Sequence, residues 1–151
     1  MRIADLIAGV AGLHRTGPFA PILAAALTIP VAWMIHWIGG FPFLVVATLI
    51  GAAKVMWARP RASVRMVADR MIGQMIALWA LSAGLWFAGV APHVFPYPGW
   101  IGAFVMFNLL VALPPIARLA ARHPLLDDVA AGAMAASVTL LAAGISHGWF
   151  G

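Results

Sequence analysis

The chain has 151 residues, of which 64% are hydrophobic and 9% are charged, and its mean hydropathy is +1.01. A soluble domain is about half apolar and about a quarter charged, so this composition excludes a water-soluble globular fold and indicates a bilayer as the solvent. The net charge of +5 comes from arginines that flank apolar runs, which favours anionic lipid headgroups over nucleic acid as partners, and the absence of cysteine excludes disulfides and thiolate metal sites.

The first 17 residues contain a short apolar stretch that is interrupted by Asp5 and followed by His14 and Arg15. This pattern predicts an interfacial or re-entrant segment rather than a cleaved signal peptide. Apolar runs long enough to cross a bilayer follow near 19–37, 41–57, 71–90, 100–116 and 129–150. The sequence therefore predicts one membrane domain over residues 1–151, an all-α polytopic helical bundle of about five transmembrane helices.

The connections between these runs alternate in charge. Arg2 and Arg15 precede the first run, four arginines separate the second from the third, and Arg118 and Arg122 separate the fourth from the fifth. The remaining connections carry no Lys, Arg, Asp or Glu. The positive-inside rule then places the N-terminus in the cytoplasm and predicts a multi-pass protein of a bacterial-type inner (plasma) membrane. Trp and Phe side chains gather at the expected outer ends, as aromatic rings do at membrane interfaces.

The four carboxylates of the chain are all expected on the cytoplasmic side. Asp69 precedes the third run, and Asp127 and Asp128 precede the fifth. Each of them alone fits a helix N-cap. If the third and fifth helices pack together, however, three carboxylates gather at the bilayer surface, where they repel one another unless a cation joins them. Mg²⁺ prefers carboxylate oxygens, water and substrate phosphate as its ligands.

Three arginines are candidates to bind a phosphate beside these acids, namely Arg65, Arg70 and Arg122. Guanidinium groups match phosphate oxygens in a bidentate geometry. Membrane topology and anchoring to lipid headgroups also account for these three arginines, and this interpretation is compatible with phosphate binding.

Lys54, about one turn from the end of the second run, fits either snorkelling to the interface or a role in a site. The histidines have no zinc-motif spacing, and the middles of the runs hold almost no polar side chain, which argues against a transporter.

Several segments resemble the phosphatidylglycerophosphatase A family. VADRMIGQMIALWAL (67–81) resembles its segment with an Asp-Glu pair, a glycine and a membrane helix, and LLDDVAAGAMAA (125–136) is similar to its Val-Asp-Asp-Ile-x-Ala-Gly segment. FVMFNLLVALPPIARL and GLHRTGPFAPILAAALTIP look like two further segments, in the family's order, so that the likeness covers roughly residues 9–141. The resemblance implies a Mg²⁺-dependent inner-membrane hydrolase that converts phosphatidylglycerophosphate to phosphatidylglycerol.

Carried over by position, the resemblance makes Asp69, Asp127 and Asp128 the catalytic and Mg²⁺-binding residues. Four further residues match family motif positions that have a structural role, namely Gly73, Phe107, Pro115 and Gly132. The chain departs from the family at Arg70 in place of Glu, Asn108 in place of Arg, Val111 in place of Asp, and Pro114 in place of Lys.

These departures leave two functions open. The first is a working phosphatase acting on an anionic phospholipid. The second is a catalytically degenerate relative that serves as a lipid-binding or accessory membrane protein. An unrelated small transporter or an accessory subunit of a membrane complex is a third hypothesis, and the sequence leaves a homo-oligomer open.

Overall fold

The computed structural model describes residues 2–64, 66–95, 97–123 and 125–146, and within these ranges the chain is helical and contains no strand. The all-α prediction is therefore confirmed. The elements are α1 (Ile3–Ala8), η1 (Leu13–Phe19), α2 (Ala20–Ala58), η2 (Arg59–Arg61), α3 (Ala68–Phe87), α4 (Tyr97–Ala112), α5 (Pro114–Ala117), η3 (Arg118–Ala121) and α6 (Leu126–Ser146).

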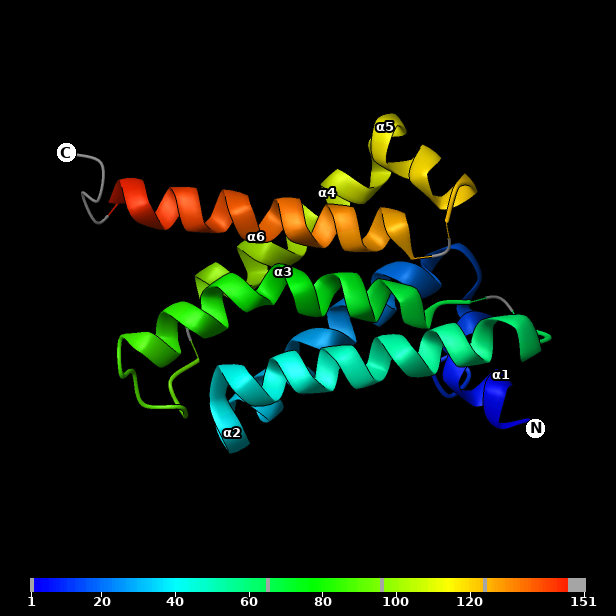
Figure 1. Ribbon diagram of the computed structural model, residues 1–151, viewed down its shortest axis with the longest axis horizontal. Coiled ribbons are helices and arrows are strands. Elements are labelled where there is room, and N and C mark those ends of the chain that lie inside the picture. The colour runs from blue at the N-terminus through cyan, green and yellow to red at the C-terminus, as the bar shows by residue number, and fades with distance from the viewer. Residues whose placement is uncertain (1, 65, 96, 124, 147–151) are drawn as a thin grey trace.

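The first two expected spans both lie within α2, whose helical geometry is broken at Gly40 (φ 67°, ψ −160°). Figure 1 shows the two halves of α2 running past each other in opposite directions. A positive φ of this kind suits glycine, and a Cβ at Gly40 would overlap the indole ring of Trp86 near the end of α3. The turn between the first two runs is therefore fixed by the backbone freedom and small size of one residue.

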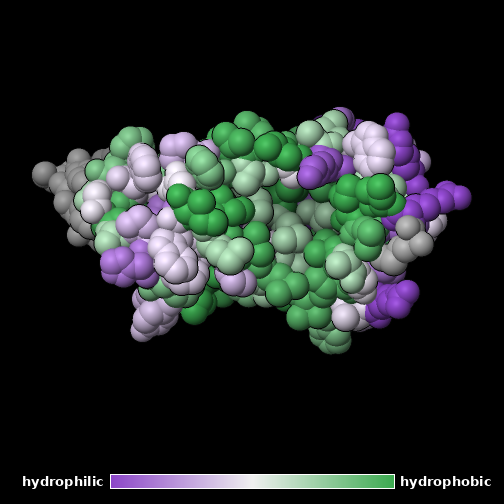
Figure 2. Space-filling view, turned by 90° about the horizontal axis from the view of Figure 1, so that it is seen from below, coloured by the Kyte–Doolittle hydropathy of each residue, from purple (hydrophilic) through white to green (hydrophobic). Residues whose placement is uncertain are grey.

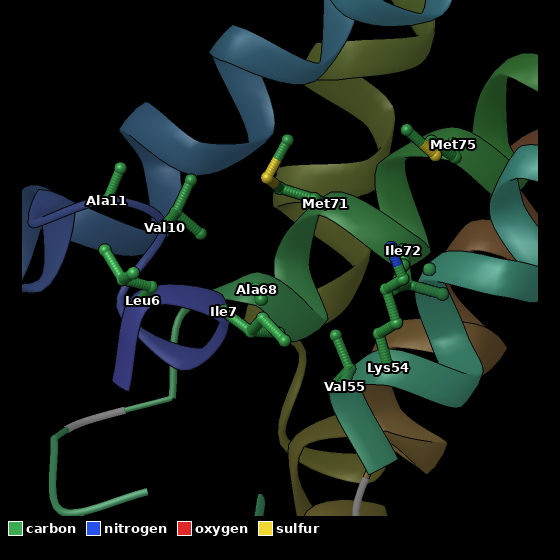
Figure 3. Close-up of a pocket in the computed structure, with 11 residues that line it drawn as sticks. Leu6, Ile7, Val10, Ala11, Lys54, Val55, Ala68, Met71, Ile72 and Met75 are labelled. Carbon is green, nitrogen blue, oxygen red and sulfur yellow. The ribbon is translucent and has the colours of Figure 1, made fainter. Parts of the chain in front are cut away.

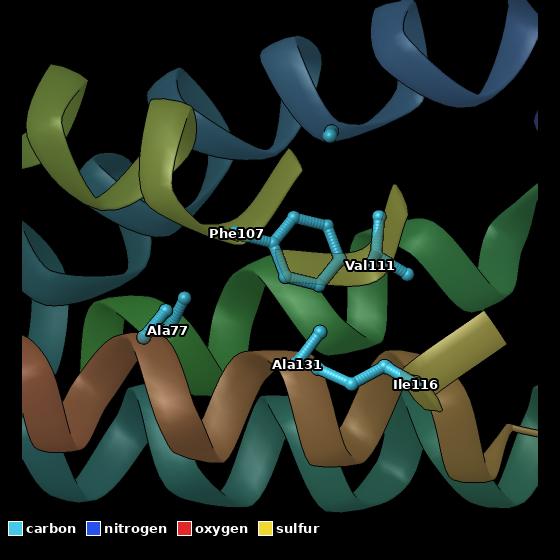
Figure 4. Packing of buried hydrophobic residues seen from close by; sticks show 7 residues of the cluster. Ala77, Phe107, Val111, Ile116 and Ala131 are labelled. Atoms are coloured by element: carbon cyan, nitrogen blue, oxygen red, sulfur yellow. The ribbon is translucent and has the colours of Figure 1, made fainter. Parts of the chain in front are cut away.

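Helix α3 lies at the centre of the bundle and packs against α2, α6 and α4 (Figure 1). Phe107 of α4, which is completely buried, fills the space beside Ala77 of α3 and Ala131 of α6, and Val111 lies next to it (Figure 4). Ala77 of α3 and Ala131 and Ala135 of α6 belong to the same buried cluster. Small side chains allow membrane helices to approach closely, so that van der Waals packing holds them together.

Two stretches of the described chain are long and apolar enough to cross a membrane, Ile3–Arg61, which contains α2, and Leu126–Ile145 of α6. A third candidate is the bent pair Tyr97–Ala112 and Pro114–Ala121. Large apolar side chains such as Leu27, Val46 and Leu141 are exposed on these helices, as expected for contact with lipid. Helix α3 is not among the candidates, so helix length and composition support fewer spans than the sequence predicted.

The two ends of the bundle differ in chemistry. One end, here called the charged end, carries α1, the C-terminal end of α2 and the first turns of α3 and α6 (Figure 1). Hydrophilic residues gather there in Figure 2, next to a broad hydrophobic band over the middle of the molecule. The other end, here called the aromatic end, carries the turn at Gly40 and the stacked rings of Trp33 and Trp37, whose centroids are 5.6 Å apart.

Two details differ from the sequence prediction, and a third falls outside the described residues. The run expected at 100–116 stops at Ala112, because Pro114 holds Leu113 in an extended conformation (ψ 132°) and the chain bends there by 68°. The fifth run extended to residue 150, and its last four positions lie outside the described residues. The bundle interior is also more polar than expected, since the buried residues include Thr28, His36, Thr48, Gln74 and Ser82.

The first residues of the chain form α1, which has six residues and is therefore about 9 Å long, far less than a bilayer core requires. The amide N–H of Val67 donates a 2.8 Å hydrogen bond to the carbonyl of Ala8. Helix α1 thus lies against the start of α3 at the charged end, and the interfacial or re-entrant placement of residues 1–17 stays a prediction.

Candidate functional site

Helices α3 and α6 cross at two glycines. A Cβ on Gly132 would overlap the carbonyl oxygen of Gly73, and a Cβ on Gly73 would lie 2.5 Å from the carbonyl oxygen of Asp128. Each glycine follows an aspartate by four residues, Asp69 on α3 and Asp128 on α6. Four residues are about one helical turn, so the close crossing brings these two aspartates to the same level at the charged end.

Asp128 is paired with an arginine from the other helix. Nη1 of Arg70 donates a hydrogen bond of 2.8 Å to Oδ1 of Asp128. The Asp128 side chain is 2% exposed and that of Arg70 is 23% exposed, so the ion pair is largely removed from solvent. Charge-assisted hydrogen bonds in such surroundings are strong, although much of the gain offsets the cost of desolvating both charges. The pair joins the first turn of α6 to the first turn of α3.

Asp69 is the second acid of this cluster. Its Oδ1 accepts a 3.0 Å hydrogen bond from the backbone N–H of Arg70, and its Oδ2 lies 3.6 Å from Nη1 of Arg59. Burial raises the pKa of Asp69, which lies in the first turn of α3 before the expected span, and the negative charge of Asp127 adds to this effect. The hydrogen bond from Arg70 and the charges of Arg70 and Arg59 act in the opposite direction.

Asp127 is the third acid and has a different environment. It is 9% exposed, and no described residue donates a hydrogen bond to its carboxylate or forms an ion pair with it. Its charge nevertheless acts on both Asp69 and Asp128. Neither carboxylate oxygen of Asp127 is a fully buried atom without a partner, so both remain accessible to water or to a cation. Of the three acids, Asp127 is therefore the one whose carboxylate is available to bind a ligand.

Of the three arginines predicted to lie beside the acids, the structure places one there. Arg70 lies in the cluster, as predicted. Arg122 is exposed and forms no ion pair with the acids in the part of the chain that the structure describes, and Arg65 lies outside that part. Arg59, which the sequence prediction did not single out, pairs with Asp69 instead. Its position directly after the long apolar run was the available signal, because α2 carries that residue to the first turn of α3.

A small cavity of about 260 Å³ adjoins the cluster and is lined by Met56, Arg59, Pro60 and His123. Because Arg59 lines this cavity and also pairs with Asp69, one guanidinium connects the cavity with the acids. The cavity thus places an anion-binding group and a histidine next to carboxylates at the surface of the bundle. We refer to Asp69, Asp127, Asp128, Arg59 and Arg70 together as the acid–arginine cluster.

The fourth acid, Asp5, is not part of the acid–arginine cluster. Its Oδ1 accepts hydrogen bonds from the backbone N–H of Ser63 at 2.7 Å and from the Ser63 hydroxyl at 3.0 Å. These bonds fasten α1 to the loop between η2 and α3. Asp5 is therefore a structural residue.

The donor atoms restrict the kind of metal site that the cluster allows. Among the described residues, no group of three or more histidine, aspartate or glutamate side chains is arranged to hold one ion. The unpartnered carboxylate of Asp127, with Asp128 beside it, fits a cation held by one or two carboxylates, water and a phosphate oxygen, which is a common arrangement for Mg²⁺. The cluster does not fit a two-metal centre, because Val111, where the resembling family has an acid, packs in an apolar cluster with Ile116 and Ala131 (Figure 4).

Comparison of the chain with protein-family models, with curated protein sequences and with solved structures finds no match. The functional assignment therefore depends on the acid–arginine cluster and on the residues that carry the sequence resemblance.

Proposed function

We propose that the protein is a membrane phosphatase that removes a terminal phosphate from an anionic phospholipid, with phosphatidylglycerophosphate as the substrate that the sequence resemblance implies. The observation that carries this proposal is the convergence of Asp69, Asp127 and Asp128 with Arg59 and Arg70 at one end of an apolar bundle. A lipid phosphate lies at the membrane surface, at the same depth as polar groups on helix ends. The cluster combines phosphate-binding cations with carboxylates that can hold a metal ion or accept a proton.

In this mechanism the arginines bind and orient the phosphate. Arg59, which lines the adjoining cavity, contacts the phosphate oxygens, and Arg70 stabilises the charge that develops on them. Asp127 and Asp128 would hold Mg²⁺, which would supply Lewis-acid polarisation of the phosphate. Asp69 accepts a proton from the attacking water. The water oxygen forms a bond to phosphorus, the bond from phosphorus to the glycerol oxygen breaks, and that oxygen takes up a proton to leave the lipid alcohol and inorganic phosphate.

The test is phosphate release from phosphatidylglycerophosphate in mixed micelles by the purified full chain, with and without Mg²⁺. We expect Asp69→Asn and Asp128→Asn each to lower kcat by about 10²-fold or more, as the loss of a general base or a metal ligand does. Asp5→Asn is the matched control, because it makes the same chemical change at the same end but outside the cluster. Full activity in both cluster variants, with helix content unchanged, would disprove the mechanism.

A non-catalytic, lipid-binding role is the second candidate. Arg70 stands where the resembling family has Glu, and its 2.8 Å ion pair with Asp128 gives that carboxylate a partner within the protein. Because Arg70 neutralises the charge of Asp128, the cluster can hold the helices together and bind anionic headgroups without hydrolysing them. This candidate predicts no Mg²⁺-dependent phosphate release together with retention on anionic vesicles. Multiple turnover of any phosphomonoester lipid would eliminate it.

We further propose that the charged end faces the cytoplasm of an inner membrane, as the distribution of arginines suggests. Because the chain has no cysteine, single cysteines report topology without a background signal. In intact cells, a membrane-impermeant maleimide should label His93→Cys, in the loop at the aromatic end. It should label Ala121→Cys, in η3 at the opposite side, only after permeabilisation. Labelling of both sites, or of neither, in intact cells contradicts this orientation.

A further inference from the structure

An apolar groove separate from the acid–arginine cluster lies between α1, the last turns of α2 and the first turns of α3 (Figure 3). Its volume is about 340 Å³, within the range of about 300–1,000 Å³ that small-molecule sites occupy. Leu6 and Val10 form one wall, and Val55, Met71 and Ile72 form another. Asp69 and Arg70 are not among the lining residues, so a molecule in this groove does not need to contact the cluster.

Among the described residues, Lys54 is the one charged residue that lines the groove. It is also the one lysine of the chain and the one charged residue within α2. None of the described residues forms a hydrogen bond or an ion pair with its ammonium group. Figure 3 shows the side chain extending beside Ile72. The groove thus presents a single unpaired cation within an otherwise apolar surface, which is complementary to a molecule with an anionic head and a hydrocarbon chain.

The α1 wall of the groove is fixed in place. Asp5 holds it to Ser63, and the Val67 N–H holds it through the carbonyl of Ala8. The chain then leaves α1 through Val10 and Ala11, which line the groove and have φ values of 46° and 53°. Left-handed backbone is rare for a β-branched residue such as Val10 and is costly. Strained residues of this kind are concentrated at ligand sites, where the surrounding structure maintains them.

We propose that this groove binds one acyl chain of an anionic phospholipid whose phosphate pairs with Lys54. This lipid is distinct from the proposed substrate and is not hydrolysed, because none of the five residues of the acid–arginine cluster lines the groove. The bound lipid would connect α1 to the bundle through its hydrocarbon chain. The proposal goes beyond the phosphatase function and does not depend on it.

The experiment uses the purified full chain in nanodiscs that contain phosphatidylglycerol with a photoreactive diazirine in one acyl chain. After irradiation, peptide mapping should locate the cross-link on Leu6, Met71 or Met75, and the same acyl chains on zwitterionic phosphatidylcholine should react less. Lys54→Gln should lower the cross-linking yield by about fivefold, the effect expected for one basic side chain near an anionic headgroup. Lys54→Arg should retain the yield, and Arg118→Gln, which removes an exposed cation elsewhere, should not change it.

A second variant addresses the groove itself. Ala68→Leu adds bulk to a groove-lining position and should also reduce cross-linking at Met71, with the helix content unchanged. Asp69→Asn should leave the cross-link intact, which separates this proposal from the phosphatase proposal. Equal yields for phosphatidylglycerol and phosphatidylcholine, or an unchanged yield in Lys54→Gln, would overturn the proposal and identify Lys54 as a residue that only reaches toward the interface.

Discussion

The charged end and the aromatic end of the bundle are stabilised by different interactions. At the aromatic end, the Phe95 ring lies 5.6 Å from both the Trp33 and Trp100 rings, and the indole N–H groups of these two tryptophans are buried without a hydrogen-bond partner among the described residues. At the charged end, three carboxylates face two arginines, and Asp127 has no partner among the described residues. The comparison indicates where an ionic ligand belongs, because in the part of the chain that the structure describes the charged end has a carboxylate with no hydrogen-bond or ion-pair partner.

The helix crossing below the cluster should produce the largest effect when it is disrupted. We expect Gly132→Leu to destabilise the fold by about 3 kcal/mol or more, because the new side chain overlaps the Gly73 carbonyl and a backbone atom cannot rotate away. Thermal unfolding in detergent measures this change. Gly102→Leu on α4 is the control, since a Cβ there meets no atom within 4 Å. Similar unfolding temperatures for the two variants would show that α3 and α6 do not cross at these glycines.

The next largest effect should come from removing the cation of the buried ion pair. Arg70→Met leaves Asp128 without its donor, which should cost about 3 kcal/mol, at the lower end of the range for breaking a buried pair because Arg70 is partly exposed. The double variant Arg70→Met with Asp128→Asn should recover much of that loss, since the carboxylate that lost its donor is then removed as well. Arg118→Met, at an exposed arginine, should change stability by about 0.5 kcal/mol or less. Strictly additive effects in the double variant would contradict the coupling.

The sequence predicted the acids better than it predicted their partners. Asp69, Asp127 and Asp128 could be grouped because each precedes an apolar run, and helix ends on one membrane side are restricted to one layer. The partners depend on which helices touch and at what rotation, and the positions of Gly73 and Gly132 determine this only after the bundle has formed.

The polar interior was missed for a related reason. His36 and Ser82 are far apart in the sequence, and each looks like an isolated residue within an apolar run. Their hydrogen bond exists because the first half of α2 and helix α3 lie side by side, so that Nδ1 of His36 and Oγ of Ser82 are 2.7 Å apart. The periodicity of either run alone contains no information on this pairing.

That hydrogen bond predicts an intermediate effect at the aromatic end. Ser82→Ala should cost about 1–2 kcal/mol, because it leaves a buried nitrogen of His36 without its partner. Ser137→Ala is the matched control, since its exposed hydroxyl donates to the Ala133 carbonyl of its own helix. Chemical denaturation of both variants in the same detergent provides the comparison. Equal losses would show that burial of the Ser82 hydroxyl does not strengthen its contribution.

The smallest expected effect is a pH dependence that originates at Asp69. Since burial raises the pKa of Asp69 above its ordinary value of 3.8, the folded protein binds this proton more tightly than the unfolded chain does. The contribution of Asp69 to stability is therefore greatest below pH 3.8 and declines as the pH rises through the higher value of the folded state. Asp69→Asn should remove this decline, so its unfolding temperature should vary less with pH than that of the unmodified protein over the same interval. A steeper dependence in the variant would mean that Arg59 and Arg70 outweigh burial at this carboxylate.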